Sequence, residues 1–106
     1  MAAVNISAEK FSQLMQEDRP VLVDYWAPWC SYCRRISAAY DKIAEEYGHR
    51  LEVVKINIDE EEPLSQREQI EVIPTLVIYK NGQALGSIVA PESKARIEEF
   101  IQQTLI

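Results

Sequence analysis

Cys30 and Cys33 stand three residues apart and are the only cysteines of the chain. They come after an apolar run at 21–25 and directly before a helical pattern over 31–47. A bond between them closes a loop too short to stabilise a fold much by chain entropy, so a purely structural disulfide is disfavoured. Cys30 is expected at a helix N-terminus, where a thiolate is stabilised. We therefore predict thiol–disulfide exchange, with Cys30 as the nucleophile and Cys33 as the resolving thiol.

Asp24 is the second residue that could do chemistry, because it interrupts an apolar, strand-like run. Burial disfavours the charged form of a carboxyl and raises its pKa, so Asp24 could take the proton of Cys33 and later return it. The same sequence pattern also fits an Asp24 that is only a structural, hydrogen-bonded acid, or one that is exposed at the edge of the sheet. Lys55, in a neighbouring predicted strand, either tunes the proton affinity of Asp24 or points to solvent.

Ile73-Pro74-Thr75 is the third feature, since a proline directly before a strand removes a ladder donor. A cis bond here would expose the backbone of Ile73, and an extended substrate could pair with it by strand addition. Spacing alone favours a trans bond, because only about 5–6% of X-Pro bonds in folded proteins are cis.

These residues need a sheet to position them. The order of the predicted elements gives a mixed sheet with helices on both faces and chemistry at the carboxyl end of a central strand. Apolar spacing, caps and turn residues predict a helix that begins after Ser7 and ends before Pro20, strands at 21–25, 51–58, 75–79 and 84–89, and helices at 31–47, 63–69 and 93–105.

The length of 106 residues fits one domain, residues 1–106. A net charge of −6 disfavours nucleic acid as a partner, because nothing here would neutralise phosphates. No apolar stretch is long enough to span a membrane, and the N-terminus lacks the basic head and apolar core of a signal peptide. We therefore expect a cytoplasmic chain that binds neither nucleic acid nor membrane.

Four segments together resemble the thioredoxin family over essentially the whole chain. They are Val21-Leu22-Val23-Asp24-Tyr25-Trp26-Ala27-Pro28-Trp29-Cys30, Lys55-Ile56-Asn57-Ile58-Asp59, Ile73-Pro74-Thr75-Leu76 and Lys80-Asn81-Gly82. The resemblance implies an α/β thioredoxin fold, with a mixed sheet of five strands (at least four) and about four flanking helices. It also implies a monomeric cytosolic reductant of protein disulfides, with a redox-active disulfide and no bound cofactor. Its expected partners are disulfide-containing proteins and a flavin-dependent thioredoxin reductase that uses NADPH.

The resemblance also implies roles for individual residues. Asp24 would be the buried proton relay, Lys55 its neighbour, and Pro74 a cis proline facing the cysteines. The substrate-contact surface would comprise Trp29, Ile73, Val89 and Ala90.

The chain departs from the family at several positions. Ser31-Tyr32 stands where thioredoxins usually carry Gly-Pro, and a tyrosine before the second cysteine is more similar to glutaredoxins. Ala90 occupies a position that is usually glycine. Ala38 replaces a proline that commonly kinks the active-site helix, so a straighter helix is expected.

We hypothesise that Ser31 and Tyr32 stabilise the Cys30 thiolate and make the disulfide more oxidising than that of a standard thioredoxin. Arg34, close to the cysteines, adds positive charge there. Neutral surface variation at 31 and 32, and a merely solvated arginine, are the alternatives.

Two other classes of function stay open. The two thiolates could bind metal, but a structural zinc site needs four ligands and His49 is the only histidine. An iron–sulfur cluster shared between two chains is a further alternative, because some glutaredoxins with Ser-Tyr between their cysteines hold a cluster in that way. The chain could also be a redox-independent subunit that binds a larger partner.

Overall fold

The central strand of the protein, β2 (Val21–Trp26), is an apolar run that is hydrogen-bonded along both of its edges. The structure is a computed structural model that describes residues 2–106. Its sheet has five strands in the order β1-β3-β2-β4-β5. The sheet is mixed and has the five strands that the resemblance implied.

The strands on either side of β2 run in opposite senses. On one side β3 (Glu52–Asn57) is parallel to β2, and β1 (Val4–Asn5) is parallel to β3. On the other side β4 (Thr75–Lys80) is antiparallel to β2 and forms a hairpin with β5 (Gln83–Val89). The sequence did not predict β1, because a strand of two residues is too short to show an alternating pattern.

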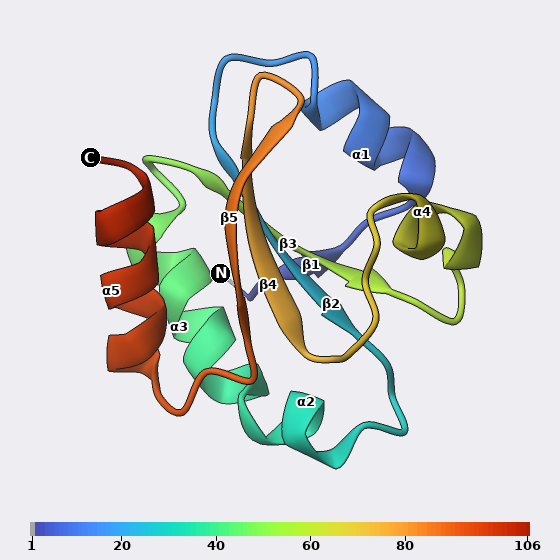
Figure 1. Ribbon diagram of the computed structural model, residues 1–106. Coiled ribbons are helices and arrows are strands. Elements are labelled where there is room, and N and C mark those ends of the chain that lie inside the picture. The colour runs from blue at the N-terminus through green and yellow to red at the C-terminus, as the bar shows by residue number, and fades with distance from the viewer. Residues whose placement is uncertain (1) are drawn as a thin grey trace.

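Helices cover both faces of the sheet (Figure 1). On one face lie α1 (Ala8–Leu14) and α4 (Glu62–Arg67), and on the other lie α3 (Ser37–Tyr47) and α5 (Lys94–Thr104). The short helix α2 (Ser31–Arg35) lies at one end of the sheet, below β2 and β4 in the view. Within residues 2–106 no helix combines the length and the apolar character needed to cross a membrane.

Alternation along β2 divides its side chains between two apolar clusters. Val21, Val23 and Tyr25 pack in the cluster that includes residues of α1 and α4, whereas Leu22 packs in the cluster that includes residues of α3 and α5. Asp24 shares the parity of Leu22 and therefore lies on the α3 face of the sheet. The period of β2 thus directs an acidic side chain into the protein interior.

The helix predicted over 31–47 is divided in the structure. Ile36, with φ −87° and ψ −1°, separates α2 from α3, so the expectation of a straighter helix from Ala38 is wrong. The Ile36 side chain is buried in the core between the two helices. The break lets α2 stay at the end of the sheet while α3 turns onto its face (Figure 1), and no proline is needed for it.

Tyr40 ties α3 to the centre of the sheet. Its ring is fully buried, and its hydroxyl lies 3.1 Å from the Leu22 carbonyl oxygen and 2.6 Å from the Val54 carbonyl oxygen. A single O–H therefore serves backbone acceptors of both β2 and β3. A buried carbonyl oxygen that loses its donor costs the full desolvation free energy of that group. The Tyr40 contact therefore helps to hold α3 against the sheet.

We expect Tyr40→Phe to lower the free energy of unfolding by about 1–2 kcal/mol, the cost of leaving a buried hydrogen-bond acceptor unsatisfied. Urea denaturation followed by circular dichroism measures the change. Tyr47→Phe is the matched control, because the Tyr47 hydroxyl has only a 3.5 Å contact with Glu98 Oε2. Equal losses in the two variants would show that the Tyr40 hydroxyl has no special role.

Candidate active site

Cys30 and Cys33 form a disulfide just beyond the carboxyl end of β2. Cys30 is the N-cap residue of α2, and its Sγ accepts a hydrogen bond from the backbone N–H of Cys33 at 3.2 Å. Cys30 is 9% exposed and Cys33 is 3% exposed. The sulfur that a partner can reach first is therefore that of Cys30, and the Cys33 N–H is already placed to stabilise negative charge on it.

The backbone of Ile73 faces the disulfide. The Ile73–Pro74 bond is cis, so the trans bond that spacing alone favoured is wrong. Cys30 Sγ lies 4.0 Å from the Ile73 carbonyl oxygen. The loop before β4 and the N-terminus of α2 thus meet at the same end of the sheet, as Figure 1 also shows.

A second segment, at the end of β5, lies beside this loop. Val89 is paired with Thr75 across the β4–β5 ladder, and the Ala90 N–H donates to the Pro74 carbonyl at 2.9 Å. Val89 is exposed and Ile73 is partly buried. Residues 73–75 and 89–90 therefore lie side by side, with Ile73 next to Cys30, and we call them the 73–90 surface. Val72, next to Ile73, is also exposed. The sequence did not predict it as a contact residue, because a single apolar residue in a loop gives no pattern.

Trp29 lies at the surface next to Cys30 and is 65% exposed. Its indole N–H donates to Asp59 Oδ2 at 2.8 Å. The sequence suggested Trp29 as a contact residue but gave no signal for Asp59. That carboxylate belongs to an acidic run after β3, thirty residues away, and only the fold brings it to the indole.

Asp24 is buried behind the disulfide and is 2% exposed, so an edge-exposed position is wrong. Its Oδ1 atom is buried and has no hydrogen-bond partner. Burial raises the pKa of Asp24 from 3.8 to about 7, although the positive charge of Lys55 opposes this rise. A carboxyl with this pKa can both accept and release a proton near neutral pH.

A cavity of about 270 Å³ connects Asp24 with the second cysteine. It is lined by Asp24, Trp26, Cys33, Arg34, Ser37 and Lys55. Several of these side chains are polar, and the volume is ample for ordered water. The predicted relay residues are therefore brought to one cavity, together with Ser37, which sequence reasoning missed because a serine at the start of a helix most often signals a cap.

Lys55 is the neighbour of Asp24 in the paired strands β2 and β3. Its Nζ lies 4.5 Å from the centre of the Trp26 ring, and the side chain is only partly exposed. The ammonium thus packs on an indole at the cavity wall, where a cation–π contact is favourable. An orientation of Lys55 entirely into solvent is wrong.

The residues between and after the cysteines are placed differently from one another. Ser31 is exposed at the start of α2. Tyr32 turns inward, and its hydroxyl donates to the Pro91 carbonyl at 3.0 Å. The Arg34 guanidinium donates a hydrogen bond to the Pro28 carbonyl at 2.7 Å. Its bond is therefore with the turn that leads into Cys30 and not with the sulfur.

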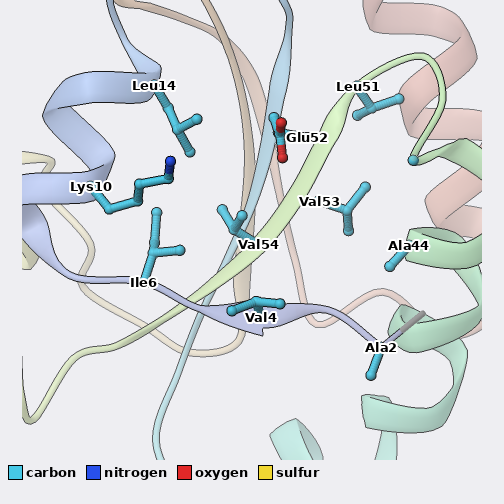
Figure 2. A pocket seen from close by; sticks show the side chains of 11 residues that line it. Ala2, Val4, Ile6, Lys10, Leu14, Ala44, Leu51, Glu52, Val53 and Val54 are labelled. Carbon is cyan, nitrogen blue, oxygen red and sulfur yellow. The ribbon is translucent and has the colours of Figure 1, made fainter.

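A further pocket lies away from the disulfide, at the β1 edge of the sheet (Figure 2). Its walls are mainly apolar, and Lys10 and Glu52 are its only charged residues. Glu52 begins β3, so the pocket lies toward the opposite end of the parallel strands from Cys30. Across residues 2–106, no three His, Cys, Asp or Glu side chains gather as metal ligands would.

Comparison with known proteins agrees with this geometry. The sequence model of the family described as Thioredoxin matches residues 2–103. "Thioredoxin 1" of Nostoc sp. is 37% identical over 105 residues, 98% of each chain, and "Thioredoxin" of Porphyra purpurea is 38% identical over 104 residues, 97% of each chain. The solved structure of thioredoxin from Malassezia sympodialis superposes with a TM-score of 0.88 at 30% identity, covering 99% of this chain and 92% of that one.

The buried carboxyl gives a pH dependence of stability that we expect Asp24→Asn to remove. The folded-state pKa of about 7 lies above the unfolded value near 3.8, so the native wild type holds the proton more tightly and loses stability as pH rises between these values. Asp24→Asn should therefore be more stable than wild type above pH 7, by a few kcal/mol, and the difference should shrink toward pH 4. Denaturant titrations of both oxidised proteins from pH 4 to 8 measure it, and a constant difference would contradict the assignment.

Proposed function

The chain belongs to the thioredoxin family and is a thiol–disulfide oxidoreductase with Cys30–Cys33 as its redox-active disulfide, and from this premise we propose how its residues share the reduction of protein disulfides. The observation that carries the proposal is the asymmetry of the cysteine pair. Cys30 is the more exposed of the two and lies beside the 73–90 surface, whereas Cys33 lines the cavity of Asp24.

In the first step the Cys30 thiolate of the reduced protein attacks one sulfur of a substrate disulfide. A Cys30–substrate bond forms, the substrate S–S bond breaks, and the other substrate sulfur leaves as a thiolate. The N–H of Cys33 and the N-terminus of α2 stabilise the attacking thiolate. Trp29, the exposed residue before Cys30, is held by Asp59.

In the second step Cys33 gives its proton to Asp24 and attacks Cys30 Sγ. The Cys30–Cys33 bond forms, the mixed disulfide breaks, and the second substrate thiolate leaves, so that two electrons have passed to the substrate. The proposed role of Asp24 is supported by its pKa of about 7 and by the cavity it shares with Cys33. Lys55, in the same cavity, keeps the pKa of Asp24 from rising further.

We assign substrate binding to the 73–90 surface. An extended segment on one side of the substrate cysteine would pair with the backbone of Ile73, next to the cis Pro74, and lie against Val89 and Ala90. The exposed apolar side chains of Trp29 and Val89 support this assignment, because such side chains near one end of the molecule favour contact with another protein.

The family implies disulfide substrates and reductase partners in general. We assign the re-reduction of Cys30–Cys33 to a flavin-dependent thioredoxin reductase that draws its electrons from NADPH. We also propose that residues 1–106 act as one domain, as a monomer, in the cytoplasm. Insulin reduction with thioredoxin reductase and NADPH, compared with glutathione as the donor, tests this choice of electron source.

The division of labour between the cysteines has a direct test. Cys33→Ser should accumulate a covalent complex with a protein disulfide, because the first attack remains while the resolving thiol is lost. Cys30→Ser should form none, and both variants should lose turnover of insulin. Non-reducing mass spectrometry detects the complex. A Cys33→Ser variant that stays uncoupled, while Cys30→Ser traps the substrate, would reverse the assignment.

Ser31 and Tyr32 give a prediction for the redox potential. We expect a value less negative than the −270 mV typical of thioredoxin, since about 30 mV corresponds to 1.4 kcal/mol of extra stability of the dithiol form. The double variant Ser31→Gly/Tyr32→Pro restores the usual residues and should return a more negative potential. Equilibration with glutathione buffers measures both proteins. A wild-type potential at or below the thioredoxin value would contradict the hypothesis.

A further inference from the structure

Tyr32 connects the two cysteines to a distant part of the chain. The residue lies between Cys30 and Cys33, yet its hydroxyl donates to the carbonyl of Pro91, 59 residues further along. The ring is partly buried against the core cluster of α3 and α5. The Arg35 guanidinium lies over it, 5.7 Å from the ring centre. Tyr32 is thus held by packing and directed toward the segment after β5.

The segment that Tyr32 holds continues from Ala90 of the 73–90 surface. Ala90 has a φ of +46°, a conformation that costs a non-glycine residue free energy and persists only where neighbours enforce it. Two hydrogen bonds bracket this residue: the Ala90 N–H donates to the Pro74 carbonyl, and the Pro91 carbonyl accepts from Tyr32. The first bond joins Ala90 to the loop before β4, and the second joins Pro91 to α2.

We propose that Tyr32 is a positioning residue that fixes the Ala90 end of the 73–90 surface and so favours extended protein disulfides over small disulfides. The proposal rests on the function proposed above. A protein segment that lies along this surface benefits from a surface already in place, because the ordering cost is not paid on binding. A small disulfide needs only the Cys30 sulfur and gains nothing from the surface.

Removal of the hydroxyl isolates this role. Tyr32→Phe keeps the ring, its packing and its contact with Arg35, and it leaves the Cys33 N–H beside Cys30. The hydroxyl bonds to Pro91, so its removal takes away that bond. An effect of Tyr32 on the reactivity of Cys30 would appear equally with every disulfide substrate, whereas a defect that appears only with a protein substrate would come from the 73–90 surface.

The experiment compares pre-reduced wild type with Tyr32→Phe on two oxidants, insulin and the small disulfide 5,5′-dithiobis(2-nitrobenzoate). With insulin, kcat/KM should fall about 2- to 10-fold, the equivalent of one neutral hydrogen bond, and the loss should lie in KM. With the small disulfide the rate should stay within about 2-fold, within the smallest effect of such a bond. Tyr47→Phe, which removes a hydroxyl whose contact is with Glu98 in α5 and not with the 73–90 surface, is the control.

Amide hydrogen exchange gives a second readout that does not depend on turnover. The Ala90 amide, which is bonded to Pro74, should exchange faster in Tyr32→Phe than in wild type or Tyr47→Phe. Equal losses on both oxidants, no loss on either, or unchanged Ala90 exchange would overturn the role of Tyr32 and leave the proposed function intact. A wild type that fails to reduce insulin would instead refute the proposed function, and this inference with it.

Discussion

The strand β2 is enclosed on all sides, and the rest of the structure follows from that enclosure. Its backbone is paired with β3 and β4, and its side chains enter apolar clusters on both faces of the sheet. A strand enclosed in this way can end only where the sheet ends, so Cys30 emerges at the carboxyl edge. The loop before β4 and the end of β5 come to the same edge because β4 runs antiparallel to β2.

The enclosure of β2 also buries the carboxyl of Asp24 away from water. Asp24 is held on the α3 face by the alternation of β2, and taking it out of β2 would disrupt both ladders. Its desolvation raises its pKa to about 7 and costs the folded state stability when the group is charged. The cost falls next to Cys33, which must lose a proton before it can resolve a mixed disulfide. The burial that destabilises the charged form of Asp24 therefore also gives this carboxyl a pKa suited to accepting a proton from Cys33.

The surface around Cys30 is assembled from segments remote in sequence. The loop at 72–74, the end of β5 and α2 each contribute one side, and single hydrogen bonds join them: Ala90 to Pro74, Tyr32 to Pro91 and Trp29 to Asp59. None of these three bonds involves a reacting sulfur. The shape of the surface that meets a partner therefore depends in part on contacts outside the cysteine pair.

The sequence by itself determined everything that depends on neighbours along the chain. The apolar run of β2, the cap at Ser7, the Asn81-Gly82 turn and the Cys30–Cys33 spacing predicted most of the elements, the order of the fold and the redox pair. The resemblance then added the cis Pro74, which spacing argued against.

Only the tertiary structure decided the short edge strand β1, the break at Ile36, the orientation of Lys55 and the bond from Tyr32 to Pro91. These features leave no local pattern because they arise when helices and strands far apart in the sequence pack together. A side chain such as that of Tyr32 can find its acceptor only after the sheet has brought residue 91 beside residue 32.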